Sequence, residues 1–118
     1  MIYLFISGEI RSGQYIYNLP RGIEGQFNIA LTDIAFQNFI APVFVLCDIA
    51  TTSLINDKTL PILRRVDSKK SIYNHMYYLK IELNTISKIR LGFLDRNLSN
   101  ITDTSFWCTL CLEPVKQV

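Results

Sequence analysis

Histidine is almost missing from this sequence of 118 residues, in which His75 is the only one. A Ser-His-Asp or Cys-His set would have no other base, and one imidazole with scattered carboxylates fits no common zinc template. No glycine-rich phosphate loop occurs. Asp33 and Asp48 could in principle form the carboxylate pair of a glycosidase, but both fit better as turn-capping residues at strand ends. The sequence therefore predicts no enzyme, no cofactor and no metal.

Cysteine is scarce as well, with Cys47, Cys108 and Cys111 making an odd count. A disulfide-stabilised secreted scaffold usually has more cysteines in an even number, so a reducing compartment is the better interpretation. Cys108 and Cys111 spell a C-x-x-C, but within a predicted strand residues three apart point to opposite faces. We expect Cys108 in the core and Cys111 partly exposed.

Neither sign of charge dominates, because 12 Lys and Arg residues stand against 10 Asp and Glu residues. A net charge of +2 leaves nucleic acid as a partner that the sequence allows but does not favour. The longest apolar run, residues 39–47, contains Pro42 and is far short of the ~20 residues of a spanning helix. The first residues lack the basic lead of a signal peptide. We expect a protein made in the cytoplasm or nucleus, neither secreted nor inserted in a membrane.

Hydrophobic residues make up 49% of the chain and aromatic residues 12%, a composition that favours strands. Apolar residues recur with a period of two. A change of parity near Thr32 and Asp33 predicts a β-bulge, and Pro20 is expected to end the second strand before a loop through Gly22. The only segments in which the sequence allows a short helical turn are residues 53–56 and 72–76. The expected strands are residues 2–7, 14–19, 26–36, 43–49, 60–66, 77–83, 86–94 and 105–112. About eight strands with short loops predict one antiparallel β-sandwich domain over residues 1–118.

The chain has more aromatic rings than one small core needs, and Tyr and Trp are enriched at protein interfaces. The candidate interface rings are Tyr15, Tyr17, Tyr73, Tyr77, Tyr78 and Trp107. A basic cluster could contact phosphates or an acidic face of another subunit, or could simply be solvated. Its members are Arg64, Arg65, Lys69 and Lys70.

Three segments carry a family resemblance: residues 33–38, the hydrophobic residues 43–48 that end in Cys47 and Asp48, and residues 60–66 with the letters LPILRRV. Together they resemble a stretch in the jelly-roll capsid proteins of Polinton/Maverick elements, adintoviruses and related double-stranded DNA viruses. The likeness covers about residues 26–113. It implies a jelly-roll-like sandwich, a place in the virion, and assembly with copies of itself, as trimers or pentamers, or with other capsid subunits.

The sequence departs from that family in two respects. The major capsid proteins are several times longer, and Asn56-Asp57 stands where a glycine often precedes the Pro-Leu-Leu-Arg-type strand. These differences favour a minor capsid, penton-like or fibre-like subunit, or a host gene derived from one. The alternatives are a ligand-binding β-sandwich, such as a lectin or receptor-binding head, and a nucleic-acid-binding barrel.

Overall fold

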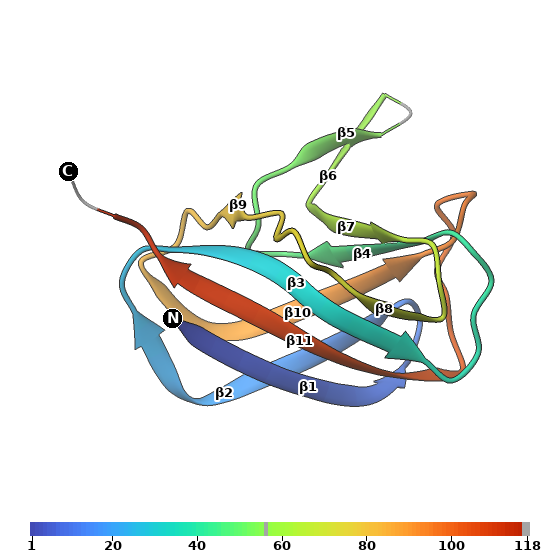
Figure 1. Cartoon of the computed structure of the whole chain (residues 1–118), viewed down its shortest axis with the longest axis horizontal. Coiled ribbons are helices and arrows are strands. Elements are labelled where there is room, and N and C mark those ends of the chain that lie inside the picture. Colours follow the sequence, from blue (N-terminus) through green and yellow to red (C-terminus); the bar gives the residue numbers. More distant parts are fainter. Residues whose placement is uncertain (56, 117–118) are drawn as a thin grey trace.

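The computed structural model of this chain describes residues 1–55 and 57–116, and every regular element in these ranges is a β-strand (Figure 1). The all-β prediction is therefore confirmed. The first sheet has the order β1 (Ile2–Ile10), β11 (Thr104–Pro114), β3 (Phe27–Phe36) and β8 (Lys70–Ile72), with β9 (Leu79–Lys80) also pairing with β3. The second has the order β2 (Gln14–Glu24), β10 (Thr85–Leu94), β4 (Val43–Cys47) and β7 (Ile62–Val66). The strands β5 (Ser53–Ile55) and β6 (Lys58–Leu60) form a separate hairpin that projects from the sandwich.

The order of the strands makes the sandwich a jelly roll, as expected. All pairings are antiparallel, and the first four strands of the chain alternate between the two sheets. The chain then returns so that β11 lies between β1 and β3, while β10 lies between β2 and β4. This double wrapping is the arrangement of jelly-roll domains.

The core lies between the sheets and follows from the period-two pattern. The predicted inward face of β10 is confirmed, because Ile89, Leu91 and Phe93 are fully buried. Phe93 contacts Phe106 of the opposite sheet with ring centroids 4.8 Å apart. The alternate residues of β11 after Phe106 are buried in the same way. Burial of these side chains holds the two sheets together.

The β-bulge predicted near Thr32 is present. Thr109 of β11 lies opposite Asp33, whereas the next residue, Leu110, lies opposite Leu31. Thr32 is therefore the extra residue, and it allows apolar side chains of opposite parity to face the same core.

The prediction that Pro20 ends the second strand was wrong. The strand β2 continues to Glu24, and its register against β10 shifts between Ile86 and Lys88. Pro20 is exposed on an edge strand, where no neighbour requires the N–H that proline lacks. The expected loop through Gly22 is therefore part of the strand.

The strand expected over residues 77–83 is also largely absent. Only Leu79–Lys80 pairs with β3, and Ile81 adds an isolated bridge to Ala50. The strand β8 pairs with the same edge of β3 at Asp33, Ile34 and Ala35, so two short strands share this edge in place of one long strand. No helical turn forms at residues 53–55 or 72–76, and the remaining residue of the first of those segments, Asn56, lies outside the described residues.

The three cysteines are all buried, which confirms Cys108 as a core residue but corrects the expectation for Cys111. Cys111 does point away from the core, yet only 1% of it is exposed, because Tyr78 lies over its thiol with the two side-chain heteroatoms 3.6 Å apart. Burial raises the pKa of both Cys47 and Cys108 from 9.0 to about 12. All three thiols are free.

We predict that the folded protein keeps its cysteines unreactive at pH 8. A chromogenic thiol reagent should label the denatured chain rapidly and the native chain at least about a hundredfold more slowly, because all three thiols are buried and burial keeps those of Cys47 and Cys108 protonated. Folding raises the pKa of Cys47 and Cys108 above that of the unfolded chain. Their contribution to stability is therefore complete below pH 9 and declines as the pH rises above it. Rapid native labelling, or stoichiometric zinc in the purified protein, would contradict this account.

The aromatic contact between the sheets yields a second prediction. Replacing Phe93 by Ala should lower the free energy of unfolding by about 3–5 kcal/mol, measured by urea denaturation, because it leaves a cavity beneath Phe106. The matched control is Ile40→Ala, at a side chain that is 84% exposed, and should change stability by less than about 0.5 kcal/mol. Equal effects at the two positions would mean that this interior contact does not hold the sheets together.

Candidate functional site

Two of the predicted interface tyrosines belong to the interior. Tyr15 and Tyr17 lie on the inward side of β2 and pack against the core. The Tyr15 ring meets Phe106 edge-on at 5.3 Å and lies so close to Gly8 that a Cβ at that glycine would clash with it. These rings close one side of the sandwich and are not available as a flat contact surface.

Two residues of the basic cluster, Arg64 and Arg65, interact with other groups of the same protein. The Arg64 guanidinium lies 3.7 Å from the centroid of the Tyr73 ring and donates a hydrogen bond to the His75 carbonyl at 3.0 Å. Burial raises the pKa of Tyr73. Arg65 forms an exposed ion pair with Asp67, with 3.3 Å between nitrogen and oxygen.

The other members of this region reach solvent. Lys69 and Lys70 are exposed where β8 begins, and Tyr77 is 57% exposed near Arg64 and Arg65. Two exposed lysines with no converging backbone N–H groups make a solvated edge and not a built phosphate site.

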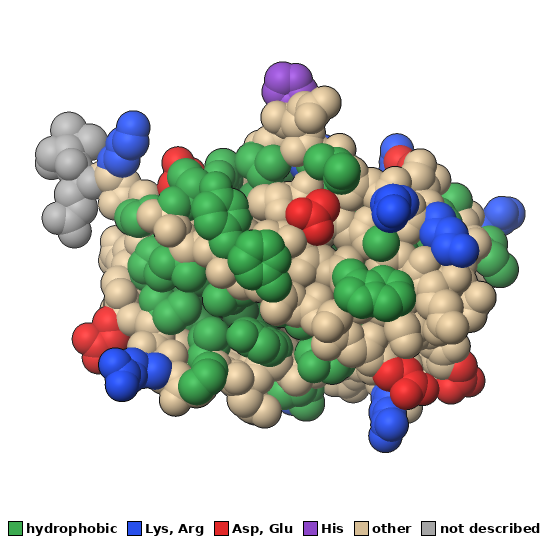
Figure 2. Space-filling view, turned by 60° about the horizontal axis from the view of Figure 1, so that its bottom comes forward, with side chains coloured by type: hydrophobic (Ala, Val, Ile, Leu, Met, Phe, Trp, Pro, Cys, Tyr) green, Lys and Arg blue, Asp and Glu red, His purple; other side chains and the backbone are tan. Residues whose placement is uncertain are grey.

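The most distinctive surface is the outer face of the five-stranded sheet, which includes Trp107 from the predicted set. In β1 the outward residues Tyr3 and Phe5 are 53% and 77% exposed, and Trp107 of β11 is 52% exposed. Ile72 of β8 is 78% exposed. Figure 2 shows hydrophobic side chains gathered on this side of the molecule, with charged groups mostly around them. We call the side chains of Tyr3, Phe5, Ile72, Tyr78 and Trp107 the outer aromatic face.

The strand register arranges this face in rows. Tyr3 lies opposite Cys111, which lies opposite Ala30, and Tyr78 covers that row. The contact with the Cys111 thiol is the main cause that raises the pKa of Tyr78 to about 12, so this phenol stays neutral.

The next row contains the Asp33 carboxylate. Phe5 lies opposite Thr109, followed by Asp33 and Ile72. The Asp33 carboxylate accepts hydrogen bonds from the Thr109 and Thr32 hydroxyls at 3.1 and 3.2 Å. Its charge is therefore solvated by hydroxyl groups, and none of the described basic groups pairs with it.

Sequence reasoning missed Tyr3, Phe5 and Ile72 as surface residues. The signal was present in residues 2–6, where every residue is apolar. A strand that is apolar on both faces must expose one of them when only one core lies beside it. Ile72 had no comparable signal, since its strand is three residues long.

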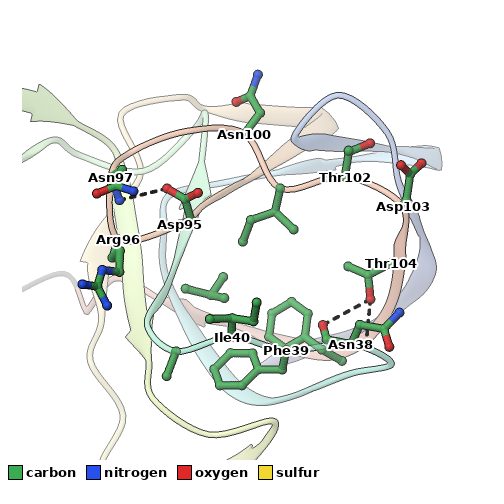
Figure 3. A pocket seen from close by; sticks show the side chains of 14 residues that line it. Asn38, Phe39, Ile40, Asp95, Arg96, Asn97, Asn100, Thr102, Asp103 and Thr104 are labelled. Atoms are coloured by element: carbon green, nitrogen blue, oxygen red, sulfur yellow. Dashed lines mark hydrogen bonds between the residues drawn. The ribbon is translucent and has the colours of Figure 1, made fainter.

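A pocket of about 490 Å³ opens at one end of the sandwich, between the β3–β4 and β10–β11 loops. Phe39 and Ile40 are apolar residues of its lining, while Arg96 and Asn100 point away from it (Figure 3). The Asp95 carboxylate already accepts two backbone N–H groups of its own loop, at 2.9 and 3.0 Å. The pocket therefore has an apolar part but no set of free polar groups that converge on one point. This makes it a poor site for a polar substrate.

Within the ranges 1–55 and 57–116, no group of three or more His, Cys, Asp and Glu side chains has the arrangement of a metal site. The described part of the chain also has no helix that is long and apolar enough to cross a membrane.

Comparisons of the chain with protein-family models, with curated proteins and with solved structures found no match. The functional interpretation therefore depends on the geometry of the outer aromatic face.

Proposed function

We propose that this protein is a non-enzymatic structural subunit of viral type, a minor capsid, penton-like or fibre-like protein that assembles with copies of itself. The observation that carries the proposal is the outer aromatic face, on which Tyr3, Phe5 and Trp107 each expose more than half of their surface. Exposed apolar patches of this kind mark protein contacts, and Trp and Tyr dominate their energetics. The jelly-roll order of the strands agrees with the family that residues 33–66 resemble.

The partner favoured by charge is another copy of the chain. A net charge of +2 gives little repulsion between copies, so apolar contact can decide the association. A Trp side chain that is half exposed presents roughly 100 Å² of apolar surface to water. Covering this surface contributes about 2.5 kcal/mol of favourable free energy, before the costs of association. Several such side chains on one face are enough for a specific contact. Assembly as trimers or pentamers in a virion, with or without other capsid subunits, is the form that the resemblance favours.

The end pocket supports a second candidate from another class. A space of about 490 Å³ whose lining includes Phe39 and Ile40 could take a small apolar group, as in a ligand-binding sandwich. In this alternative the protein, as a monomer or a trimer, would bind its ligand in the pocket and not on the face of the sheet.

We predict that Trp107→Ser weakens self-association by at least about tenfold in dissociation constant, because it removes buried apolar area worth more than about 1.4 kcal/mol. Light scattering coupled to size exclusion measures this over a range of protein concentrations. The matched control is Ile16→Ser, at a 44% exposed side chain on the outside of the other sheet, and should leave association within about twofold. A wild-type protein that stays strictly monomeric at about 100 µM would overturn the proposal in favour of the ligand-binding alternative.

Salt provides an independent prediction. Raising the ionic strength from about 0.05 to 0.5 M should leave the assembly largely intact, since screening weakens charge contacts and not apolar ones. Sedimentation velocity at several salt concentrations checks this. Complete dissociation at the higher salt would assign the contact to charged residues such as Lys69 and Lys70, and not to the outer aromatic face.

A further inference from the structure

The strand β1 forms one edge of the five-stranded sheet and pairs with β11 on its inner side only. No described strand pairs with its other side. Such an edge presents unpaired backbone N–H and C=O groups and can accept a further strand. Proteins that do not use an edge in this way usually protect it with charges, prolines or a short length.

The other described edges carry such protection. The strand β2 contains Pro20 and Arg21, and β7 contains Arg64 and Arg65. On the far side of the five-stranded sheet, β8 and β9 are three and two residues long, and each contains a lysine. In contrast, β1 has nine residues and no proline, and its first charged residue is Glu9. Among these edges, β1 alone is long, apolar and unprotected.

We infer that β1 pairs antiparallel with β1 of a second copy, so that the two five-stranded sheets join edge to edge. This inference rests on the proposed function, because it names one contact through which the subunits assemble. The second copy is favoured because the apolar segment is complementary to itself. A two-fold axis places identical strands antiparallel, as an isologous contact requires.

The alternation of side chains limits the register. Outward residues must lie opposite outward residues of the second copy. The two-fold axis therefore places one residue of β1 opposite the same residue of the second copy, and not opposite its neighbour in the sequence. With the axis at Leu4, Tyr3 of each copy lies opposite Phe5 of the other, which gives two aromatic cross-strand pairs on the outer face. With the axis at Phe5, Tyr3 would instead lie opposite Ser7.

The structure favours the axis at Leu4. The axis at Leu4 uses residues 2–6 and leaves Glu9, which is ion-paired with Arg11 at 3.7 Å, outside the paired segment. It also brings the outer aromatic faces of both copies side by side. A two-fold contact closes at a dimer, so larger assemblies need the outer aromatic face as a second contact.

A charge swap within β1 tests the pairing and its register. Phe5→Lys should raise the dissociation constant by at least about tenfold, since it places a cation opposite Tyr3 of the second copy. Adding Tyr3→Glu should restore association to within about threefold of the wild type, because each new carboxylate then lies opposite a new lysine. Ser7→Lys, at an exposed residue of the same strand and face, is the matched control and should have little effect. Sedimentation velocity measures association, and circular dichroism verifies that each variant is folded.

The outcomes separate this inference from the proposed function. If the wild type associates but Tyr3→Glu fails to rescue Phe5→Lys, edge pairing at this register is wrong while assembly through the outer aromatic face stands. If Phe5→Lys has no effect at all, edge pairing is wrong and the outer aromatic face contacts its partner without Phe5. If Ser7→Lys disrupts association as strongly as Phe5→Lys, the axis does not pass through Leu4. If the wild type is a monomer, the proposed function itself fails.

Discussion

The contact between Phe93 and Phe106 is the interaction on which the rest of the structure depends. It joins one sheet to the other at 4.8 Å, and Phe36 and Tyr15 pack against the same two rings. Because side chains alternate along a strand, burying Phe106 inward fixes Trp107 outward. A slip of one residue in β11 would move its entire apolar set to solvent, so the core also determines the composition of the outer aromatic face.

The strands that the sequence predicted best are those with an uninterrupted period of two. Residues 86–94 and 105–112 have one clear apolar face, and each corresponds to a long strand with that face buried. The bulge at Thr32 was predictable because the apolar parity changes there. These features are local consequences of side-chain direction, which the sequence contains directly.

The failures occurred where the answer depends on neighbouring strands. Whether Pro20 ends a strand depends on whether a partner needs its N–H, and an edge position removes that need. The alternation of residues 77–83 did not show that only Leu79–Lys80 would pair with β3, nor that β8 would pair with the same edge farther along. The hairpin of β5 and β6 contacts few other elements, and its sequence has no alternating apolar pattern from which it could have been predicted.

The candidate interface shows the same division. Trp107 was predicted as an interface residue by its type, and it lies on the outer face because Phe106 and Cys108 on either side of it are buried. Tyr15 and Tyr17 were assigned to the surface by residue type, although their alternation with Ile16 identified them as one face of a strand and left the side undecided. Cys111 was expected to be partly exposed because it points away from the core, but a ring from a distant segment, Tyr78, covers it. Residue type alone does not separate a ring that closes a sandwich from one that contacts a partner.

The outer aromatic face and the unprotected edge of β1 meet at the same strand, and Asp33 restricts what can cover them. This carboxylate lies in the same row as Phe5 and is held by the Thr32 and Thr109 hydroxyls. Burying this carboxylate without a further hydrogen-bond donor would be unfavourable in free energy, because a desolvated charge needs a partner. Edge pairing at Leu4 extends the sheet sideways and leaves the middle of the face open to water. Any contact that covers Trp107 from above must therefore either stop short of Asp33 or bring a hydrogen-bond donor to it, and in the proposed assembly this carboxylate would restrict the alignment of two apolar faces.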